Sequence, residues 1–328
     1  MVLTFKDEGG ALNLYVYAFL CTSIGIKAVR SASFGTKILG IRKDILAELP
    51  IPLPDDQTLS RIVSNVRVAV EKREQYAASL KAARGVVEAL PEMIQARAMC
   101  VERRARCVSW SGDLPTLNAW NFASTGNALN HLLAHWPGRL TDVVSADGIF
   151  RGNRFARIPC DPPHGVDLYS QRDVFLLRPV PQRVLIPNAD VSRLSVPVGS
   201  LLAGGQGTLG EGEIFGRVAI ATRRLERSAI SEHLLRIQPQ QTHRALVYAF
   251  LSTLVGRRLV RSTAVGTKLL SLRPDLLLKL PIPDLPADSL RLVANTVSDA
   301  LDAHEAADAA EAEAARLIEE EVLPQWLA

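Results

Sequence analysis

Aromatic residues and cysteines are scarce in this 328-residue sequence, and no apolar stretch is long enough to cross a membrane. Aromatic side chains make up 5% of the residues. The apolar run Ala11 to Ile26 is shorter than the roughly 20 residues that a membrane span needs. Residues 1–10 lack the pattern of a signal peptide. The four cysteines have no paired spacing and are typical of reduced thiols in a cytoplasmic protein: Cys21, Cys100, Cys107 and Cys160.

Sequence motifs of catalysis and of metal binding are also missing. There is no G-x-S-x-G, no G-x-x-x-x-G-K-S/T, and no pair of carboxylates with a lysine of the kind found in nucleases. Residues 205–210 fit G-x-G-x-x-G, but residues 213–220 are strand-like where a nucleotide fingerprint needs a helix. Asp161-Pro-Pro-His164 lacks the aromatic ring of the amino-methyltransferase motif, and His131 with His135 is typical of ordinary helix histidines. None of these motifs therefore indicates a metal or a cofactor site.

Charge is distributed unevenly along the chain. The sequence has 38 Lys and Arg against 34 Asp and Glu, a net charge of +4. Residues 57–106 are net basic and residues 287–328 are strongly acidic. Residues 151–242 are also basic, almost entirely because of arginine. This pattern predicts two helices that attract each other beside a basic surface that suits an anionic partner.

One long segment occurs twice. Residues 17–52 align without a gap with residues 248–283 at an offset of 231, and about twenty of the thirty-six positions are identical. Both copies contain a G-T-K turn and end in Leu-Pro-Ile-Pro. Because 231 residues are far more than the period of a solenoid, the repeat indicates one large module that has been duplicated with two-fold pseudo-symmetry.

The local pattern within each unit is readable. In the first copy we expect a helix over Tyr17 to Ala28, a turn at Gly35, a strand over Ile38 to Ile41 and a short helix capped by Asp44. Each copy is followed by a long helix, over residues 57–100 and 289–323, with apolar residues at heptad spacing. Their opposite charges and the two-fold repeat predict an antiparallel pair.

A duplicated module with a G-T-K turn and an L-P-I-P exit into a long helix resembles the specificity subunits of type I restriction enzymes. Weaker motifs in the middle of the chain agree: Gly138–Val144, Val198–Leu202 with Gly204–Thr208, and Ile230–Ile237. The resemblance implies an α+β fold in which mixed α/β target-recognition domains are joined by two long helices that form an antiparallel coiled coil. It also implies double-stranded DNA and methyltransferase subunits as partners, and the restriction or translocase subunit where the complex cleaves DNA. Chemistry would then reside in those other subunits, so the resemblance implies no catalytic residue, no metal and no cofactor in this chain.

On this resemblance, residues 1–56 are the C-terminal remnant of a first recognition domain and residues 57–106 the central coiled-coil helix. Residues 107–286 are a complete recognition domain and residues 287–328 the C-terminal coiled-coil helix. The family has two full recognition domains, so most of the first is missing here. Three explanations stay open: a truncated gene product, a late start, or a second chain that supplies the other domain.

The residues that we expect to contact DNA belong to the loops and the basic turns of the recognition domain. Arginine suits guanine and glutamine or asparagine suits adenine in the major groove, while lysine and arginine neutralise phosphates. The backbone amides of a G-T turn could also hold a phosphate. The candidates are Arg151, Asn153, Arg154, Arg157, Gln206, Thr208, Arg217, Arg257, Arg258, Arg261, Thr267, Lys268 and its copy Lys37.

Two other functions stay open. The first is a coiled-coil scaffold, or a half-subunit that depends on a partner and does not recognise DNA by itself. The second is a self-contained DNA methyltransferase or nuclease, which the missing motifs disfavour. The sequence does not reveal which bases are recognised or whether the complex cleaves or only methylates DNA.

Overall fold

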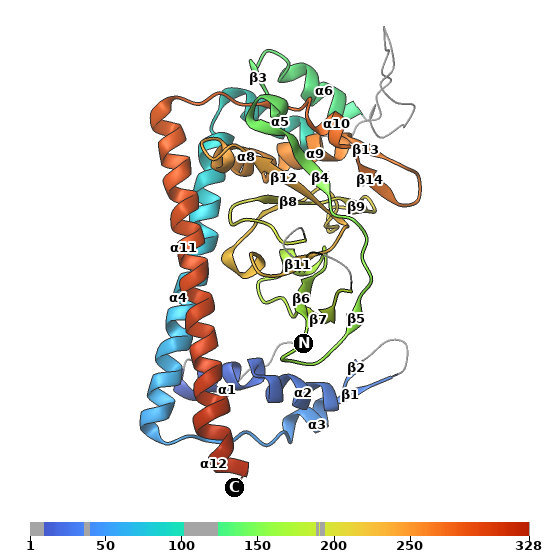
Figure 1. The fold of residues 1–328 in the computed structure, drawn as a ribbon. Helices are drawn as coiled ribbons and strands as arrows, with labels where there is room; N and C mark the ends of the chain where they lie inside the picture. Colours follow the sequence, from blue (N-terminus) through green and yellow to red (C-terminus); the bar gives the residue numbers. More distant parts are fainter. Residues whose placement is uncertain (1–9, 36–39, 102–123, 188–189, 191–193, 328) are drawn as a thin grey trace. The chain divides into compact units, whose positions relative to one another are not determined.

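The chain folds into mixed helices and strands (Figure 1). The computed structural model describes these parts of it: residues 10–35, 40–101, 124–187, 190 and 194–327. Internal contacts divide the chain into two compact units. We call residues Met1–Ala78 with Ala300–Ala328 the helical unit, and residues Ser79–Asp299 the sheet unit. The presence of long helices together with several small sheets confirms the predicted α+β class.

The first copy of the repeat lies in the helical unit and consists of α1 (Ala11–Cys21), α2 (Ser23–Ser31), β1 (Ser33–Phe34), β2 (Gly40–Ile41) and α3 (Lys43–Ala47). The prediction of one helix over residues 17–28 is wrong, because the chain bends by 84° between α1 and α2. Thr22 makes this break: its Oγ1 accepts the Gly25 N–H at 3.0 Å and donates to the Phe19 carbonyl at 2.7 Å. Among the described residues, only this bent pair, taken together, has the length and apolar character of a membrane span, and no single helix has them.

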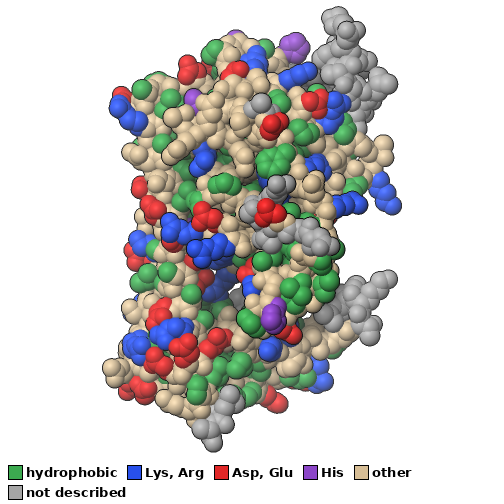
Figure 2. All heavy atoms as spheres, viewed as in Figure 1, with side chains coloured by type: hydrophobic (Ala, Val, Ile, Leu, Met, Phe, Trp, Pro, Cys, Tyr) green, Lys and Arg blue, Asp and Glu red, His purple; other side chains and the backbone are tan. Residues whose placement is uncertain are grey.

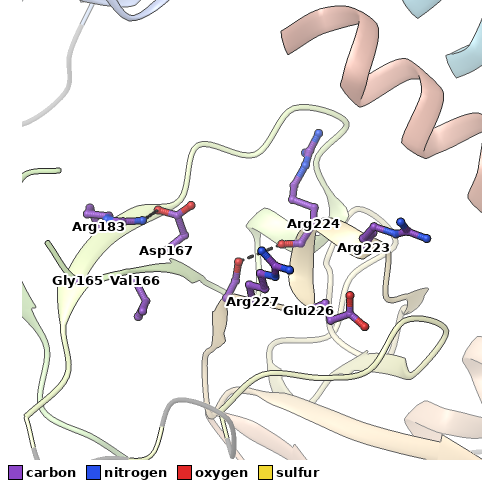
Figure 3. Close-up of a pocket in the computed structure, with 9 residues that line it drawn as sticks. Gly165, Val166, Asp167, Arg183, Arg223, Arg224, Glu226 and Arg227 are labelled. Atoms are coloured by element: carbon purple, nitrogen blue, oxygen red, sulfur yellow. Dashed lines mark hydrogen bonds and ion pairs between the residues drawn. The ribbon is translucent and has the colours of Figure 1, made fainter. Parts of the chain in front are cut away.

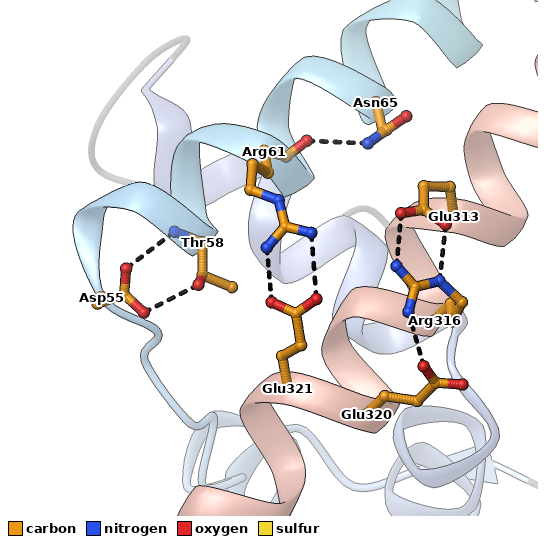
Figure 4. A network of polar contacts seen from close by, with 8 residues as sticks. All are labelled: Asp55, Thr58, Arg61, Asn65, Glu313, Arg316, Glu320 and Glu321. Carbon is orange, nitrogen blue, oxygen red and sulfur yellow. Dashed lines mark hydrogen bonds and ion pairs between the residues drawn. The ribbon is translucent and has the colours of Figure 1, made fainter.

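The two long helices run antiparallel within the helical unit, as the sequence predicts. They are α4 (Asp56–Glu88) and α11 (Ala287–Leu317), and the latter continues through a π-helical turn, η5 (Ile318–Val322), into α12 (Leu323–Leu327). Arg61 on α4 binds Glu321 (Figure 4). Arg73 on α4 binds Asp308 on α11, so residue numbers rise along one helix as they fall along the other. Apolar side chains from both helices and from α1 share one core: Tyr15, Phe19, Ile62, Val66, Leu317 and Ile318.

Helix α4 is shorter than the sequence suggests. We expected a helix over residues 57–100, but α4 ends at Glu88 and a separate helix, α5 (Pro91–Val101), follows. Proline has no N–H to donate inside a helix and is tolerated at the first helical position, so Pro91 starts a new helix. At 1.5 Å per residue, the 33 residues of α4 extend about 50 Å.

The described residues of the sheet unit form two four-stranded sheets and two smaller ones. The first has the order β10-β8-β12-β4 and the second the order β11-β6-β7-β5. A third sheet has the order β13-β14-β9, and β15 pairs with β3. The strands are β3 (Gly138–Arg139), β4 (Val144–Arg151), β5 (Ile158–Pro159), β6 (Val166–Tyr169), β7 (Gln182–Leu185), β8 (Leu201–Gly204), β9 (Gln206–Gly207), β10 (Val218–Ile220), β11 (Ala229–Ile230), β12 (Leu234–Pro239), β13 (Ala264–Val265), β14 (Leu270–Leu272) and β15 (Pro281–Ile282).

Helices and helical turns complete the sheet unit, and helix α8 packs against β10 and β12. Within the described residues they are α5 (Pro91–Val101), α6 (Ser124–Leu132), α7 (Leu140–Val143), η2 (Asp173–Phe175), η4 (Arg223–Leu225), α8 (Arg244–Leu251), α9 (Leu254–Ser262) and α10 (Pro274–Leu277).

The second copy of the repeat has the same helix break as the first. Thr253 begins α9 as Thr22 begins α2: its Oγ1 accepts the Gly256 N–H at 3.0 Å and donates to the Phe250 carbonyl at 2.7 Å. A Cβ on Gly256 would lie 2.2 Å from the Phe250 oxygen, so only glycine fits there.

The hairpins β1–β2 and β13–β14 have the same register in the two copies of the repeat. Ser33 pairs with Ile41 in the first copy, and Ala264 pairs with Leu272 in the second. In each copy an arginine two residues before an aspartate binds its carboxylate, and the Arg42 and Arg273 Nε atoms lie 3.2 and 2.9 Å from the oxygens. The short helix begins before Asp44, so this residue lies in the first turn and not at the predicted N-cap. The duplication at an offset of 231 therefore extends to individual hydrogen bonds.

Candidate nucleic-acid interface

The glycine turn and the G-T-K turn of the sheet unit lie side by side. Strand β9 pairs with β14, so Gln206 is opposite Ser271 and Gly207 is opposite Leu270. Thr208 follows β9, while Thr267 and Lys268 precede β14, and all three are exposed. Two segments that are about sixty residues apart in the sequence therefore present candidate contacts on one edge of the fold.

The backbone and side chain of Gln206 are held in place by two neighbours. The Gln171 side-chain amide donates to the Gln206 carbonyl at 2.7 Å and accepts the Gln206 N–H at 3.2 Å. It therefore bonds to the backbone of Gln206 as a neighbouring strand would. The Gln206 Oε1 lies within hydrogen-bond distance of His233 Nδ1. An amide that is oriented in this way suits the recognition of a base edge, because its geometry does not have to be fixed on binding.

Arg151 is half-buried and binds the protein's own backbone. Its Nη2 donates to the Gly205 carbonyl at 2.8 Å and to the Leu272 carbonyl at 3.1 Å. Burial lowers the pKa of this guanidinium below its usual value. Arg151 therefore fastens the glycine turn to strand β14.

Three arginines of helix α9 hold the loop that follows the glycine turn. Arg261 is only 6% exposed, and it donates to the Phe215 and Gly210 carbonyls, both at 2.9 Å. Arg257 donates to the carbonyls of residues 210, 211 and 213 at 2.7 to 3.2 Å, and Arg258 binds the carboxylate of Glu211. Burial, reinforced by the neighbouring guanidinium groups, lowers the pKa of Arg261 to about 10.

Arg217, at the far end of the same loop, adds a fourth anchor. Its Nε donates to the Glu213 carbonyl at 3.1 Å and its Nη2 to the Gly212 carbonyl at 3.2 Å. Arg217, Arg257 and Arg261 thus bind backbone carbonyls of this loop, and Arg258 binds its Glu211 side chain.

The other predicted loop follows strand β4 and is more open. Asn153 and Arg154 are exposed. Arg157 forms an ion pair with Glu232, and its guanidinium carbon lies 4.8 Å from the centre of the Phe155 ring. Lys37, the copy of Lys268 in the first repeat, lies outside the described residues.

A basic cavity in the second sheet was missed by the sequence reasoning. Its volume is about 650 Å³, and its lining includes four arginines, namely Arg183, Arg223, Arg224 and Arg227, with the acids Asp167 and Glu226 (Figure 3). Arg183 donates to the Asp167 carboxylate at 3.0 Å, which neutralises part of this charge. The cluster Arg223-Arg224 with Arg227 was visible in the basic stretch 151–242, but only the fold brings Arg183 opposite it.

The motifs that the sequence analysis set aside have ordinary surroundings. The chain continues from β9 into a loop and then strand β10, so no helix follows Gly210 as a nucleotide fingerprint requires. His135 lies 3.0 Å from the Leu132 carbonyl and 3.3 Å from Glu92. Within the described part of the chain, no group of three or more His, Cys, Asp or Glu residues could hold a metal ion.

No protein-family model matches the chain, and no curated protein matches it. Among solved structures, the chain is similar to the S subunit of a type I restriction-modification system from M. genitalium, at 14% sequence identity and a TM-score of 0.32. The match covers 93% of this chain and 69% of that one.

Proposed function

We propose that this chain is the DNA sequence-recognition subunit of a type I restriction–modification system and is not itself an enzyme. The observation that carries the proposal is the duplication at an offset of 231, which extends to the Thr22 and Thr253 caps and to the hairpin register. A protein with two-fold pseudo-symmetry suits a target in two halves, since operator symmetry mirrors protein symmetry. The sequence resemblance and the antiparallel helices support the same conclusion.

In this proposal residues 107–286 form the complete recognition domain, which binds half of a bipartite duplex target. Bases are recognised by the oriented Gln206 with Asn153 and Thr208, and phosphates are bound by Arg154, Lys268 and Thr267. The anchored arginines 151, 157, 217, 257, 258 and 261 act mainly by holding the loops that carry these contacts. The cavity around Arg227 provides a further phosphate site.

Helices α4 and α11 form the coiled coil on which methyltransferase subunits dock, with a restriction subunit added where the complex cleaves DNA. The chemistry takes place in those subunits. Residues 1–56 belong to the C-terminal part of a first recognition domain.

A mobility-shift titration of the purified chain with its methyltransferase subunit tests the proposal. We expect duplex binding that weakens steeply with salt, since each neutralised phosphate releases counterions. Methylation sequencing of the host genome with and without the gene should reveal one bipartite motif whose methylation is lost. Absence of duplex affinity even with the partner present would favour a scaffold, and methyl transfer by the isolated chain would favour an enzyme.

A further inference from the structure

His233 is not among the predicted DNA contacts, yet its side chain lies directly beside one of them. Its Nδ1 is 2.5 Å from Gln206 Oε1, and its Nε2 is 3.8 Å from the carboxylate of Glu232. The histidine side chain is 43% exposed, so this pair lies at the surface of the sheet unit. Because an amide oxygen can only accept a hydrogen bond, Nδ1 carries the hydrogen and donates it to Oε1.

The backbone that carries this histidine is held in several places. The Gly205 N–H donates to the His233 carbonyl at 3.0 Å, and the His233 N–H donates to Ser231 Oγ at 3.2 Å. Arg236, which is fully buried, donates to the Ile230 carbonyl at 2.9 Å at the start of the same turn. The fold therefore sets the position of the imidazole against the neighbouring amide before any ligand binds.

One end of the Gln206 amide is left for a ligand. His233 binds its oxygen, while the Gln171 side chain bonds to its backbone. In the part of the chain that the structure describes, no group accepts a hydrogen bond from Gln206 Nε2. The amide therefore presents its two N–H donors, with its oxygen already engaged.

Basic side chains of the sheet unit favour DNA without a preference for sequence. Figure 2 shows Lys and Arg side chains spread over the surface of this unit. Contacts to phosphates position a protein on the duplex but carry no sequence information directly. Base preference must come from side chains with a defined donor or acceptor. In the major groove guanine presents two acceptors, N7 and O6, whereas adenine presents the acceptor N7 beside an N6 donor.

We propose that His233 is a positioning residue for base recognition: it holds the Gln206 amide oxygen, so that the Gln206 nitrogen donates to N7 and O6 of a guanine. An unrestrained glutamine would instead pair with adenine through both ends of its amide. The inference rests on the proposed function and names one base of the target. His233 acts through Gln206 and needs no contact of its own with DNA.

Selection from a randomised duplex library tests this inference. The full chain is mixed with its methyltransferase subunit, and the bound duplexes are sequenced for the wild type and for Gln206→Ala. We expect the wild type to select guanine over adenine by about tenfold at one position, because a correct base contact discriminates to this extent. Gln206→Ala should lose the preference at that position and keep it elsewhere.

Substitutions of His233 then test its role. His233→Asn keeps a side-chain donor and should retain the guanine. His233→Asp offers only acceptors, so it should bind the amide nitrogen and turn the oxygen outward. Adenine or cytosine, which present an amino donor, should then replace guanine. In a Gln206→Ala background His233→Asp should leave the base preference unchanged, because the histidine acts through the glutamine.

His243→Asp is the matched control. It makes the same change at a half-buried histidine whose Nδ1 lies 3.0 Å from Thr242 Oγ1. We expect it to weaken binding to all sequences alike, since an added negative charge repels phosphates whatever the bases are.

The outcomes separate this inference from the proposed function. Adenine in place of guanine at the position that Gln206→Ala relaxes, or no relaxed position at all, would overturn the inference alone. A guanine preference that persists in a folded His233→Asp protein would do the same. If that variant does not fold, the base identified through Gln206→Ala still decides. If the wild type retains no duplex even with its partner, the proposed function fails and the inference fails with it.

Discussion

Arg73 on helix α4 and Glu311 on helix α11 form an ion pair with 3.0 Å between Nη2 and Oε2. The same Nη2 binds Asp308, and Arg73 is only 8% exposed. His304 lies 3.4 Å from Asp308 and makes an edge contact with Tyr76. One basic side chain therefore neutralises two acids between α4 and α11, and this arrangement favours a single register of the antiparallel pair.

Removal of this arginine should be costly. Arg73→Leu leaves Asp308 and Glu311 without their counter-charge, and we expect the free energy of unfolding to fall by about 3 kcal/mol. Arg61→Leu is the matched control, because the Arg61–Glu321 pair is exposed and contributes about 1 kcal/mol or less. Urea denaturation followed by circular dichroism measures both. Equal losses in the two variants would contradict a special role for Arg73.

The glycine at the helix break should not tolerate a methyl group. Gly256→Ala places a Cβ 2.2 Å from the Phe250 carbonyl, so we expect a loss of about 2–4 kcal/mol or a failure to fold. Gly85→Ala in helix α4 meets no atom within 4 Å and should stabilise the protein by up to about 1 kcal/mol. Thermal melts of both variants check the contrast, which a stable Gly256→Ala protein would contradict.

Tyr15 should make stability fall at high pH. Its buried hydroxyl donates to the Pro52 carbonyl, and burial raises the pKa of Tyr15 from 10.0 to about 12. The folded state holds this proton more tightly than the unfolded state. The resulting stability is therefore complete below pH 10 and is lost as pH rises through about 12. Tyr15→Phe should remove this part of the pH dependence, and identical profiles above pH 10 would refute the assignment.

The cysteines should differ in reactivity. Cys100 is 8% exposed, and burial raises the pKa of its thiol to about 11, so little thiolate forms at mildly alkaline pH. Cys21 and Cys160 are half-buried. We expect iodoacetamide to label these two at least about tenfold faster than Cys100, as measured by peptide mass spectrometry. In denaturant all three should react alike, and fast labelling of Cys100 in the folded protein would contradict the burial.

Substitutions of DNA-contacting residues and of loop-anchoring residues should differ in their effects on the melting temperature. Lys268→Gln should leave the melting temperature unchanged, while it weakens duplex binding and lowers the salt slope by about 1. Arg261→Gln removes bonds to the Phe215 and Gly210 carbonyls and should lower the melting temperature at the same time. The reverse pattern would show that Arg261 contacts DNA and Lys268 does not.

The sequence predicts those features that depend on a repeated pattern. The heptad spacing and the opposite charges indicate the antiparallel helices, because both follow directly from residue identity and period. The helix break at Thr22 could not be inferred from hydrophobicity, since α1 and α2 are apolar on both sides of it. Its signal was the Thr-x-x-Gly spacing, in which a threonine cap takes the glycine N–H.

Arginine roles were harder to predict. Arg257 and Arg261 were predicted to contact DNA because arginine neutralises phosphates, yet the fold turns them toward the carbonyls of residues 210–215. Those carbonyls converge only after β9 and β10 have formed, so no local sequence pattern identifies Arg257 and Arg261 as the residues that bind them. The cavity around Arg183 and Arg227 arises in the same way from segments about forty residues apart.

The arginines of helix α9 bind the loop between β9 and β10 mostly through the main-chain oxygens of that loop. Glu211 is the loop residue that accepts through its side chain, from Arg258. Carbonyl oxygens are present whatever side chains a loop carries. Side chains at positions such as 208, 209 and 212 can therefore be substituted without loss of the hydrogen bonds between the arginines and the loop backbone. Under the proposed function, substitutions within this one loop should change the target preference while helix α9 stays intact.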